Sequence, residues 1–280
     1  MREIKYEKIV ETVAKLCIDA NYYLNCDIKC ALETGRENED SQMAKNILDI
    51  LLENADIAKT DGLAICQDTG MAVVYIEMGQ ESFVTGGYLY DAINEGVAKG
   101  YGDGYLRKSI VKDPVRRENT NDNTPAVIHM EIVKGDGFEI TVAPKGFGSE
   151  NMSRLHMLTP SAGLEGVKKA IVDTVRNAGP NPCPPVVVGV GVGGTMDKAA
   201  MLAKRALLRP VDCHNPDPYW AEVEADLYEE INKLNIGPGG FGGKTTCLGV
   251  GIEVFPTHIA GLPVAVNIGC HVTRHASAKI

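Results

Sequence analysis

Two short apolar runs constrain the fold of this 280-residue chain more than any other feature. Residues 71–76 and 186–190 are almost entirely aliphatic, and each run has the length of a buried strand. Segments with helical periodicity occur before, between and after these runs, over residues 5–25, 161–178 and 196–208. This interspersed order predicts an α/β (α+β) protein with mixed sheets, flanking helices and a helical N-terminal part.

A second pattern predicts a β-hairpin. Residues 125–133 and 137–143 alternate apolar and polar side chains on either side of a Lys-Gly-Asp-Gly turn. No internal repeat and no low-complexity linker interrupts the chain. We therefore expect one continuous domain over residues 1–280.

The composition is that of an ordinary globular protein, with 44% hydrophobic and 23% charged residues. A net charge of −9 argues against nucleic acid and anionic membranes as partners. No apolar run approaches the ~20 residues of a membrane helix, and the N-terminus lacks the apolar core of a signal peptide. We expect a cytoplasmic protein without a nucleic-acid or membrane partner.

The chain has eight cysteines, which are not expected to form disulfides in a cytoplasmic protein of this size. No Cys-x-x-Cys pair is present, and this disfavours a zinc ribbon or a thioredoxin-type site. Cys66, Cys183 and Cys270 stand apart because each lies in a segment rich in glycine, proline or polar residues. Three thiolates would suit a 4Fe–4S cluster with one iron left without a protein ligand, although their wide spacing matches no local motif.

The segment around Cys66 is open to two interpretations. It reads Ala-Ile-Cys-Gln-Asp-Thr-Gly and leads directly into the apolar run that begins at Met71. Cys66 could be a buried thiol beside an ordinary Asp-Thr-Gly turn. Alternatively, reactive groups placed directly before a rigid strand are well held for binding or catalysis.

Two glycine-rich motifs resemble nucleotide sites but lack the necessary context. The run from Gly189 to Gly194 fits the dinucleotide pattern, yet residues 209–216 do not read as the second parallel strand that such a site needs. We expect these glycines to allow close packing of a helix on a strand. Residues 236–245 resemble a phosphate-binding loop, but Pro238 replaces a required glycine and a strand follows instead of a helix.

Five polar and glycine-rich motifs occur in a fixed order along the chain. They are Ile-Cys66-Gln-Asp-Thr-Gly, Asn119-Thr followed by Asn123-Thr-Pro-Ala, Lys145-Gly-Phe-Gly-Ser-Glu-Asn, Pro-Cys183-Pro-Pro and Gly269-Cys-His-Val-Thr-Arg-His. Over nearly all of residues 5–280 the chain resembles the alpha subunit of a two-subunit class I (iron–sulfur) fumarate hydratase. The related L(+)-tartrate dehydratase alpha subunit shares the Cys-Gln-Asp-Thr-Gly and Cys-Pro-Pro motifs.

Details of these motifs favour the fumarate enzyme over the tartrate enzyme. The glycine loop contains Gly-Ser-Glu-Asn, and histidine rather than tryptophan follows Cys270. Asn121 and Phe147 depart from the family pattern. Phe147 could narrow the pocket and change the preferred dicarboxylate.

The resemblance implies a role for each motif residue. Cys66, Cys183 and Cys270 would hold a 4Fe–4S cluster with one iron not ligated by protein. Substrate contacts are implied for Gln67, Asp68, Arg107, Gly148 and Asn151. Asp68 and His258 would be catalytic, with His258 pairing with Asp68 to tune proton transfer. Without the resemblance, a surface arginine and a structural histidine would be the ordinary interpretations of Arg107 and His258.

The resemblance implies an iron–sulfur hydro-lyase that acts on C4 dicarboxylates. Its expected reaction is the reversible hydration of fumarate to (S)-malate. In single-chain relatives a further C-terminal domain supplies arginines, a lysine and a threonine base, whereas this chain ends ten residues after Cys270. We therefore expect a hetero-oligomer in which a separate beta subunit completes the site, and activity only with that subunit. The alternatives are an L(+)-tartrate dehydratase alpha subunit, a non-catalytic iron–sulfur protein, a structural zinc protein and a dinucleotide-binding protein.

Overall fold

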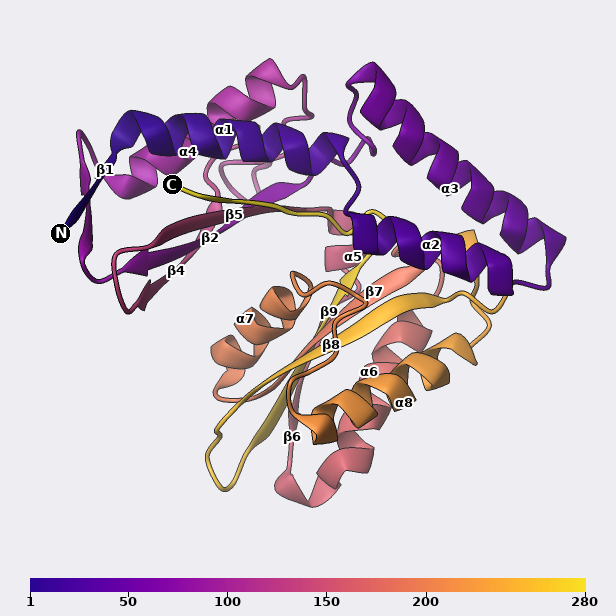
Figure 1. The fold of residues 1–280 in the computed structure, drawn as a ribbon. Coiled ribbons are helices and arrows are strands. Elements are labelled where there is room, and N and C mark those ends of the chain that lie inside the picture. Colours follow the sequence, from indigo (N-terminus) through magenta and orange to yellow (C-terminus); the bar gives the residue numbers. More distant parts are fainter. The chain divides into compact units, whose positions relative to one another are not determined.

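The computed structural model describes residues 1–280 and divides into two compact units, each assembled from separate stretches of the chain (Figure 1). The first unit consists of Met1–Leu24, Ala55–Phe147 and Arg274–Ile280. The second consists of Asn25–Asn54 and Gly148–Thr273. The expected α/β (α+β) class with mixed sheets is confirmed. Whether the two units act together as the single expected domain stays a prediction.

The first unit contains six strands and two complete helices. They are β1 (Arg2–Lys5), α1 (Tyr6–Tyr22), β2 (Met71–Gly79), β3 (Ser82–Thr85), α4 (Leu89–Asp103), β4 (Val127–Val133), β5 (Phe138–Lys145) and β10 (Ala276–Lys279). The central sheet has the order β10-β5-β2-β4, and β1 pairs with β3 separately. Helices α1 and α4 share one apolar core with this sheet. Gly96 lets them pack closely, since a Cβ there would lie 2.7 Å from the Cβ of Val13.

The expected hairpin of residues 125–133 and 137–143 is wrong in its pairing. The two strands exist as β4 and β5, but β2 lies between them, parallel to β4 and antiparallel to β5. The turn instead encloses the end of β2, where the N–H of Gly79 donates to the carbonyl of Gly137 (2.7 Å). The physical reason is that β2 is largely apolar and is buried by having a neighbouring strand on each side.

The second unit contains four strands, four complete α-helices and two short 3-10 helices. They are α2 (Cys26–Asn38), β6 (Arg154–Leu158), η1 (Pro160–Ala162), α6 (Gly163–Ala178), β7 (Val186–Gly193), α7 (Met196–Ala206), α8 (Pro218–Asn232), η2 (Pro238–Gly240), β8 (Cys247–Phe255) and β9 (Leu262–Gly269). Two further helices, α3 (Gln42–Asp61) and α5 (Phe147–Glu150), have residues in both units. None of the helices is long and apolar enough to span a membrane.

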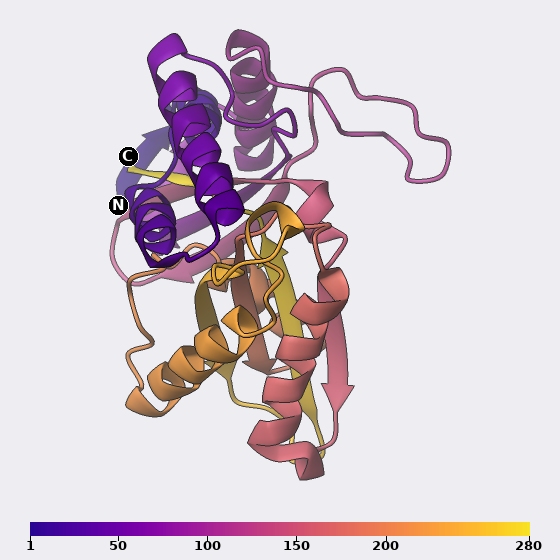
Figure 2. The ribbon, with the colours of Figure 1, turned by 90° about the vertical axis from the view of Figure 1, so that its right-hand side faces the viewer.

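The sheet of the second unit has the order β6-β9-β7-β8, with β7 buried along its whole length. Val186, Val188, Val190 and Val192 of β7 share a core with α6 and α8, the two helices that lie in front of this sheet in Figure 2. Gly189 and Gly191 of the same strand face α7. A Cβ on Gly189 or Gly191 would lie 2.2 Å or 2.1 Å from a backbone oxygen of α7. The expected role of these glycines in close helix-to-strand packing is therefore confirmed.

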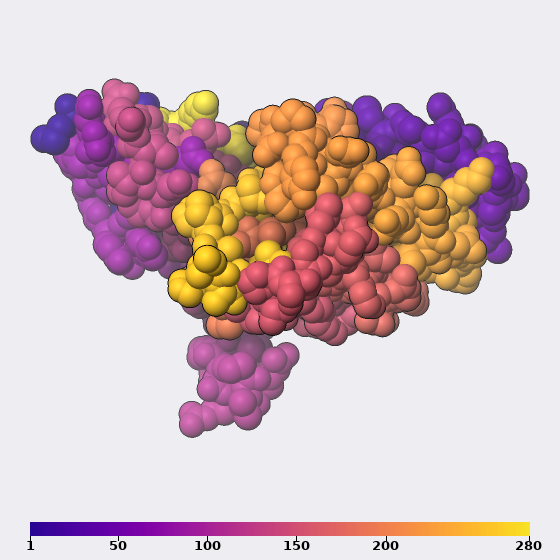
Figure 3. Space-filling view, turned by 90° about the horizontal axis from the view of Figure 1, so that it is seen from below, coloured from indigo at the N-terminus to yellow at the C-terminus, as the bar shows by residue number.

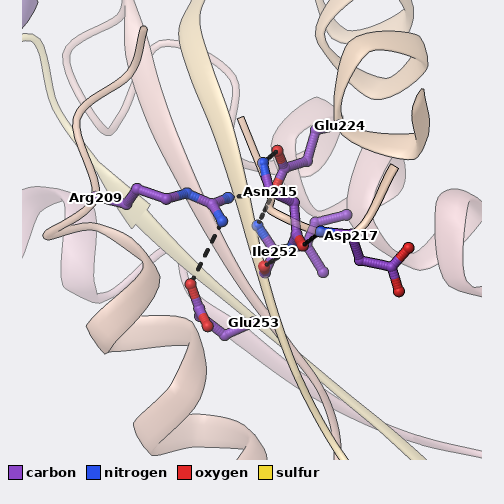
Figure 4. A network of polar contacts seen from close by, with 6 residues as sticks. All are labelled: Arg209, Asn215, Asp217, Glu224, Ile252 and Glu253. Carbon is purple, nitrogen blue, oxygen red and sulfur yellow. Dashed lines mark hydrogen bonds and ion pairs between the residues drawn. The ribbon is translucent and has the colours of Figure 1, made fainter. Parts of the chain in front are cut away.

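A network of polar contacts holds the segment between α7 and α8 against β8 (Figure 4). The carboxylate of Glu224, 3% exposed, binds the guanidinium of Arg209. It also accepts hydrogen bonds from the N–H groups of Asn215 (2.9 Å) and Ile252 (2.7 Å). This segment is a fixed loop, so the second parallel strand of a dinucleotide site is absent.

Replacing Glu224 by alanine is expected to lower the free energy of unfolding by about 3–5 kcal/mol, because it leaves Arg209 with only the more distant carboxylate of Glu253 and removes the acceptor of the Asn215 and Ile252 N–H groups. Glu229→Ala on the same helix removes only the exposed partner of Lys233 and should cost less than about 1 kcal/mol. Urea unfolding of both variants measures the difference. Equal losses would show that the network does not stabilise this loop.

Candidate functional site

Asp68, in the segment that carries Cys66, is fixed by the backbone around it. Its carboxylate accepts hydrogen bonds from the N–H groups of Gly70 (3.0 Å) and Phe147 (2.8 Å). A Cβ on Gly146 would lie 3.1 Å from the same carboxylate, so glycine permits the close approach of this chain segment. The main-chain carbonyl of Asp68 accepts a hydrogen bond from the buried guanidinium of Arg274 (2.7 Å). Hydrogen bonds therefore orient both the side-chain carboxylate and the main-chain carbonyl of Asp68.

The turn after Asp68 is held by two buried side chains. The hydroxyl of Tyr101 donates to the carbonyls of Thr69 (2.7 Å) and Gly70 (3.1 Å). Burial raises the pKa of the Tyr101 hydroxyl, which keeps it a hydrogen-bond donor. The amide of Asn123 also donates to the Gly70 carbonyl (3.2 Å). Asn123 belongs to the Asn-Thr-Pro-Ala motif and could be singled out from the sequence, whereas no motif contains Tyr101.

Arg107 is connected to the same segment through its backbone. Its carbonyl oxygen accepts a hydrogen bond from the hydroxyl of Thr69 (3.0 Å), three residues after Cys66. The side chains of Arg107 and Gln67 are exposed, and Cys66 is half-buried. The first unit thus brings together Cys66, Gln67, Asp68 and the backbone of Arg107, and it leaves the side chains of Gln67 and Arg107 exposed.

Cys183 lies in a tight, proline-rich loop that leads into β7. Its backbone is in the left-handed region at φ +56°, and its N–H donates to the carbonyl of Pro180 (3.1 Å). The glycine-rich loop of residues 237–243 packs on it: Gly239 N–H donates to the Pro184 carbonyl (2.8 Å). A Cβ on Gly240 would lie only 2.3 Å from the Cβ of Pro180. The motif that resembles a phosphate-binding loop therefore supports the Cys183 loop.

Strand pairing brings the loops of Cys183 and Cys270 to one edge of the sheet. β7 begins just after Cys183, β9 ends just before Cys270, and the strands are antiparallel neighbours with Val187 opposite Gly269. The backbone N–H and ring Nδ1 of His271 lie 3.4 Å and 2.9 Å from the carbonyl oxygen of Cys183. His271, the residue after Cys270, directly joins the two loops.

The loop that carries Gly148 and Asn151 is fixed beside the same edge. A Cβ on Gly148 would lie 3.8 Å from the carbonyl oxygen of Asn181, two residues before Cys183. Glu150 binds Lys204 (2.5 Å) and accepts a hydrogen bond from the amide of Asn267 on β9 (2.8 Å). The second unit therefore places this loop beside both cysteine loops, and the side chain of Asn151 is exposed.

His258 lies elsewhere in the second unit. It occupies the exposed turn between β8 and β9, where its Nδ1 accepts the N–H of Ala260 (3.2 Å). Cys270 follows the other end of β9, and eight strand residues span about 25 Å. His258 instead borders an apolar hollow of about 400 Å³ that Trp220 and Ile259 also line. The structure does not bring His258 to Cys270, and its pairing with Asp68 stays a prediction.

The accessible cysteines suit an iron–sulfur cluster better than the buried ones do. Cys66 and Cys270 are half-buried and Cys183 is exposed, so their sulfurs can reach a ligand. Burial raises the pKa of the Cys17 and Cys247 thiols to about 12, which opposes the thiolate form that binds metal. No group of three His, Cys, Asp or Glu side chains within one unit could hold a metal ion. Three thiolates are suitable ligands for a 4Fe–4S cluster. Of the expected ligands, Cys66 belongs to the first unit, and Cys183 and Cys270 belong to the second.

Comparison with known proteins gives matches over almost the whole chain. The model of the fumarate hydratase (fumerase) family matches residues 10–279. A putative L(+)-tartrate dehydratase subunit alpha from Methanocaldococcus jannaschii is 41% identical over 281 residues, 98% of each chain. The L(+)-tartrate dehydratase subunit alpha of Escherichia coli (strain K12) is 33% identical over 276 residues, 98% of this chain and 91% of the relative. Residues of both units lie within these matches.

Gly240→Ala is expected to displace the loop that supports Cys183. Gly242 is a matched control, because both glycines have φ near +82° but a Cβ at residue 242 would have no neighbour closer than 4.0 Å. Each substitution should cost about 1 kcal/mol of backbone strain, and Gly240→Ala about 1–3 kcal/mol more through overpacking against Pro180. Hydrogen exchange at Gly239 should accelerate only in Gly240→Ala. Equal exchange and stability in the two variants would contradict the supporting role.

Proposed function

Because this chain belongs to the class I fumarate hydratase family, as a hydro-lyase alpha subunit, we propose that it holds a 4Fe–4S cluster and works on a C4 dicarboxylate with a separate beta subunit. The observation that carries this proposal is the match over residues 10–279, which contains all the site residues expected from the sequence. The names of the relatives, which are alpha subunits, support a partner subunit.

Cys66, Cys183 and Cys270 are the proposed cluster ligands, with one iron not ligated by protein. Each precedes or follows a buried strand, so each loop is held by a rigid element. Arg274, four residues beyond Cys270, binds the carbonyl oxygen of Asp68, two residues beyond Cys66. When bound, such a cluster supplies Lewis acidity toward a hydroxyl and its neighbouring carboxylate.

The polar residues beside Cys66 have the chemistry to bind and orient a dicarboxylate. The guanidinium of Arg107 suits bidentate binding of a carboxylate, and its fixed backbone sets where that side chain starts. The amide of Gln67 can donate to a second oxygen. The carboxylate of Asp68 is held by two backbone N–H groups, so it presents its remaining lone pairs in one direction, as an oriented proton acceptor requires.

Gly148 and Asn151 are the proposed substrate contacts from the second unit. Glu150, which lies between them, is bound to α7 and β9 and keeps the turn in place. The pairing of His258 with Asp68 in proton transfer stays a prediction. Asp68 is the proposed proton acceptor on this chain.

The relatives favour L(+)-tartrate as the substrate over the fumarate or malate expected from the sequence. Tartrate dehydratase alpha subunits are 41% and 33% identical to this chain over nearly its full length. Fumarate is the second candidate, because the family model carries that name and the glycine loop reads Gly-Ser-Glu-Asn. In either case water is removed from a 2-hydroxy acid carboxylate or added back across a carbon–carbon double bond.

Serine substitution of Cys66, Cys183 or Cys270 is expected to reduce the bound iron to less than about a tenth of that in the unaltered protein, because each thiolate supplies one of only three ligands. Cys213→Ser is the control, since Cys213 is exposed in a loop and belongs to no motif. Iron and acid-labile sulfide are measured after anaerobic purification. Iron loss in Cys213→Ser, with retention in the other three, would overturn the ligand assignment.

With the beta subunit present, kcat/KM for L(+)-tartrate is expected to exceed that for malate at least about tenfold, since a site that binds the extra hydroxyl discriminates against a substrate without it. Anaerobic steady-state kinetics with both acids and with fumarate measures the ratio. A tartrate-to-malate ratio of kcat/KM below one would favour fumarate and malate as the substrates. Absence of turnover with all three, together with an electron paramagnetic resonance spectrum unchanged by any of them, would contradict the hydro-lyase assignment.

A further inference from the structure

A hairpin-like arm, residues 105–120, projects from the first unit between α4 and β4. Figures 2 and 3 show it in magenta, as a ribbon that extends away from the neighbouring elements in Figure 2 and as a protruding group of atoms in Figure 3. Backbone hydrogen bonds close it: Lys112 N–H donates to the carbonyl of Glu118 (2.8 Å), and Thr120 N–H to that of Ile110 (2.9 Å). The arm is therefore a built element and not a loose connection.

The tip of the arm is held in one shape by Asp113. Its carboxylate accepts the N–H groups of Val115 (2.9 Å) and Arg116 (2.6 Å), and its carbonyl accepts that of Arg117 (3.0 Å). Val115 lies in this turn and is 85% exposed. The next two residues, Arg116 and Arg117, are also exposed. A tip ordered before binding loses little entropy when it docks.

The charge of the arm is opposite to that of the chain. It contains five basic and two acidic residues, a net charge of +3 within a chain of −9. Lys112 is paired with Glu118 (2.5 Å), so the free positive charge at the tip comes from Arg116 and Arg117. Arginine is one of the residues enriched at protein interfaces.

The root of the arm is attached to the proposed site. Ser109 N–H donates to the side-chain carbonyl of Asn123 (2.7 Å), and the amide of Asn123 donates to Gly70. Arg107 accepts the Thr69 hydroxyl, as described above. A protein that covers the substrate residues of the first unit would therefore meet this arm.

We propose that the arm is a docking element for the beta subunit, and that the complementary surface presents carboxylates around an apolar hollow for Val115. The proposal rests on the proposed function, in which the beta subunit completes the site. The exposed Val115 side chain can be buried against a protein surface, whereas an apolar side chain does not attract a small dicarboxylate anion. The attachment to the Cys66 segment favours the subunit that closes the site over a second copy of this chain.

The double substitution Arg116→Glu and Arg117→Glu tests the proposal. It should weaken binding of purified beta subunit about tenfold or more at low salt and flatten the salt dependence of binding. Lys5→Glu with Lys8→Glu is the control, because these exposed lysines of the same unit undergo the same change in charge away from the arm. Binding is measured by calorimetry over a range of salt concentrations, without substrate. Circular dichroism verifies that both variants are folded.

Three results would overturn the proposal. Unchanged binding of the beta subunit by the arm variant would remove the arm from that interface. Conversion of a self-associated alpha chain to a monomer, with unchanged beta binding, would assign the arm to a second copy. An increased KM for the dicarboxylate with unchanged beta binding would assign it to substrate attraction. If the unaltered chain does not bind the beta subunit, the proposed two-subunit function is rejected together with the arm proposal. The three results above reject only the arm proposal.

Discussion

The hydrogen bond from the guanidinium of Arg274 to the carbonyl of Asp68 joins parts of the first unit that lie 206 residues apart in the sequence. Arg274 is buried, and its Nε also donates to the side chain of Asn21 on α1 (3.2 Å). A buried charge is tolerated only with such partners, so the guanidinium fixes the positions of three chain segments at once. The orientation of Asp68, and with it the Cys66 segment, depends on this contact.

Glycine has a comparable structural role in the second unit. Gly189 and Gly191 let α7 lie directly on β7, and Gly240 lets one loop press on Pro180. At these positions any side chain would meet backbone or ring atoms within about 2.3 Å, closer than packed atoms approach. The glycine-rich motifs that resemble nucleotide sites are therefore explained by packing, and the second of them positions the loop that carries Cys183.

The sequence predicted strands and helices with good accuracy where periodicity was strong, as in α6, α7 and β7. It failed where pairing had to be chosen. The alternation of β4 and β5 was correctly recognised, but nothing local indicated that β2 would lie between them. Nor does sequence distance indicate position on the sheet, because the twelve-residue separation of His258 and Cys270 includes the whole of β9 and places the two residues at opposite ends of that strand.

By itself the sequence determined the strands with a strong pattern, such as β2, β4, β5 and β7, and which cysteines lie in motif loops. It also determines that residues 105–120 are basic. These properties follow from local periodicity, composition and charge. Only the tertiary structure decided the strand order, the contact of His271 with the Cys183 loop, and the support that residues 237–243 give to that loop. Such contacts depend on which apolar faces are buried together, and this choice is made by the whole chain.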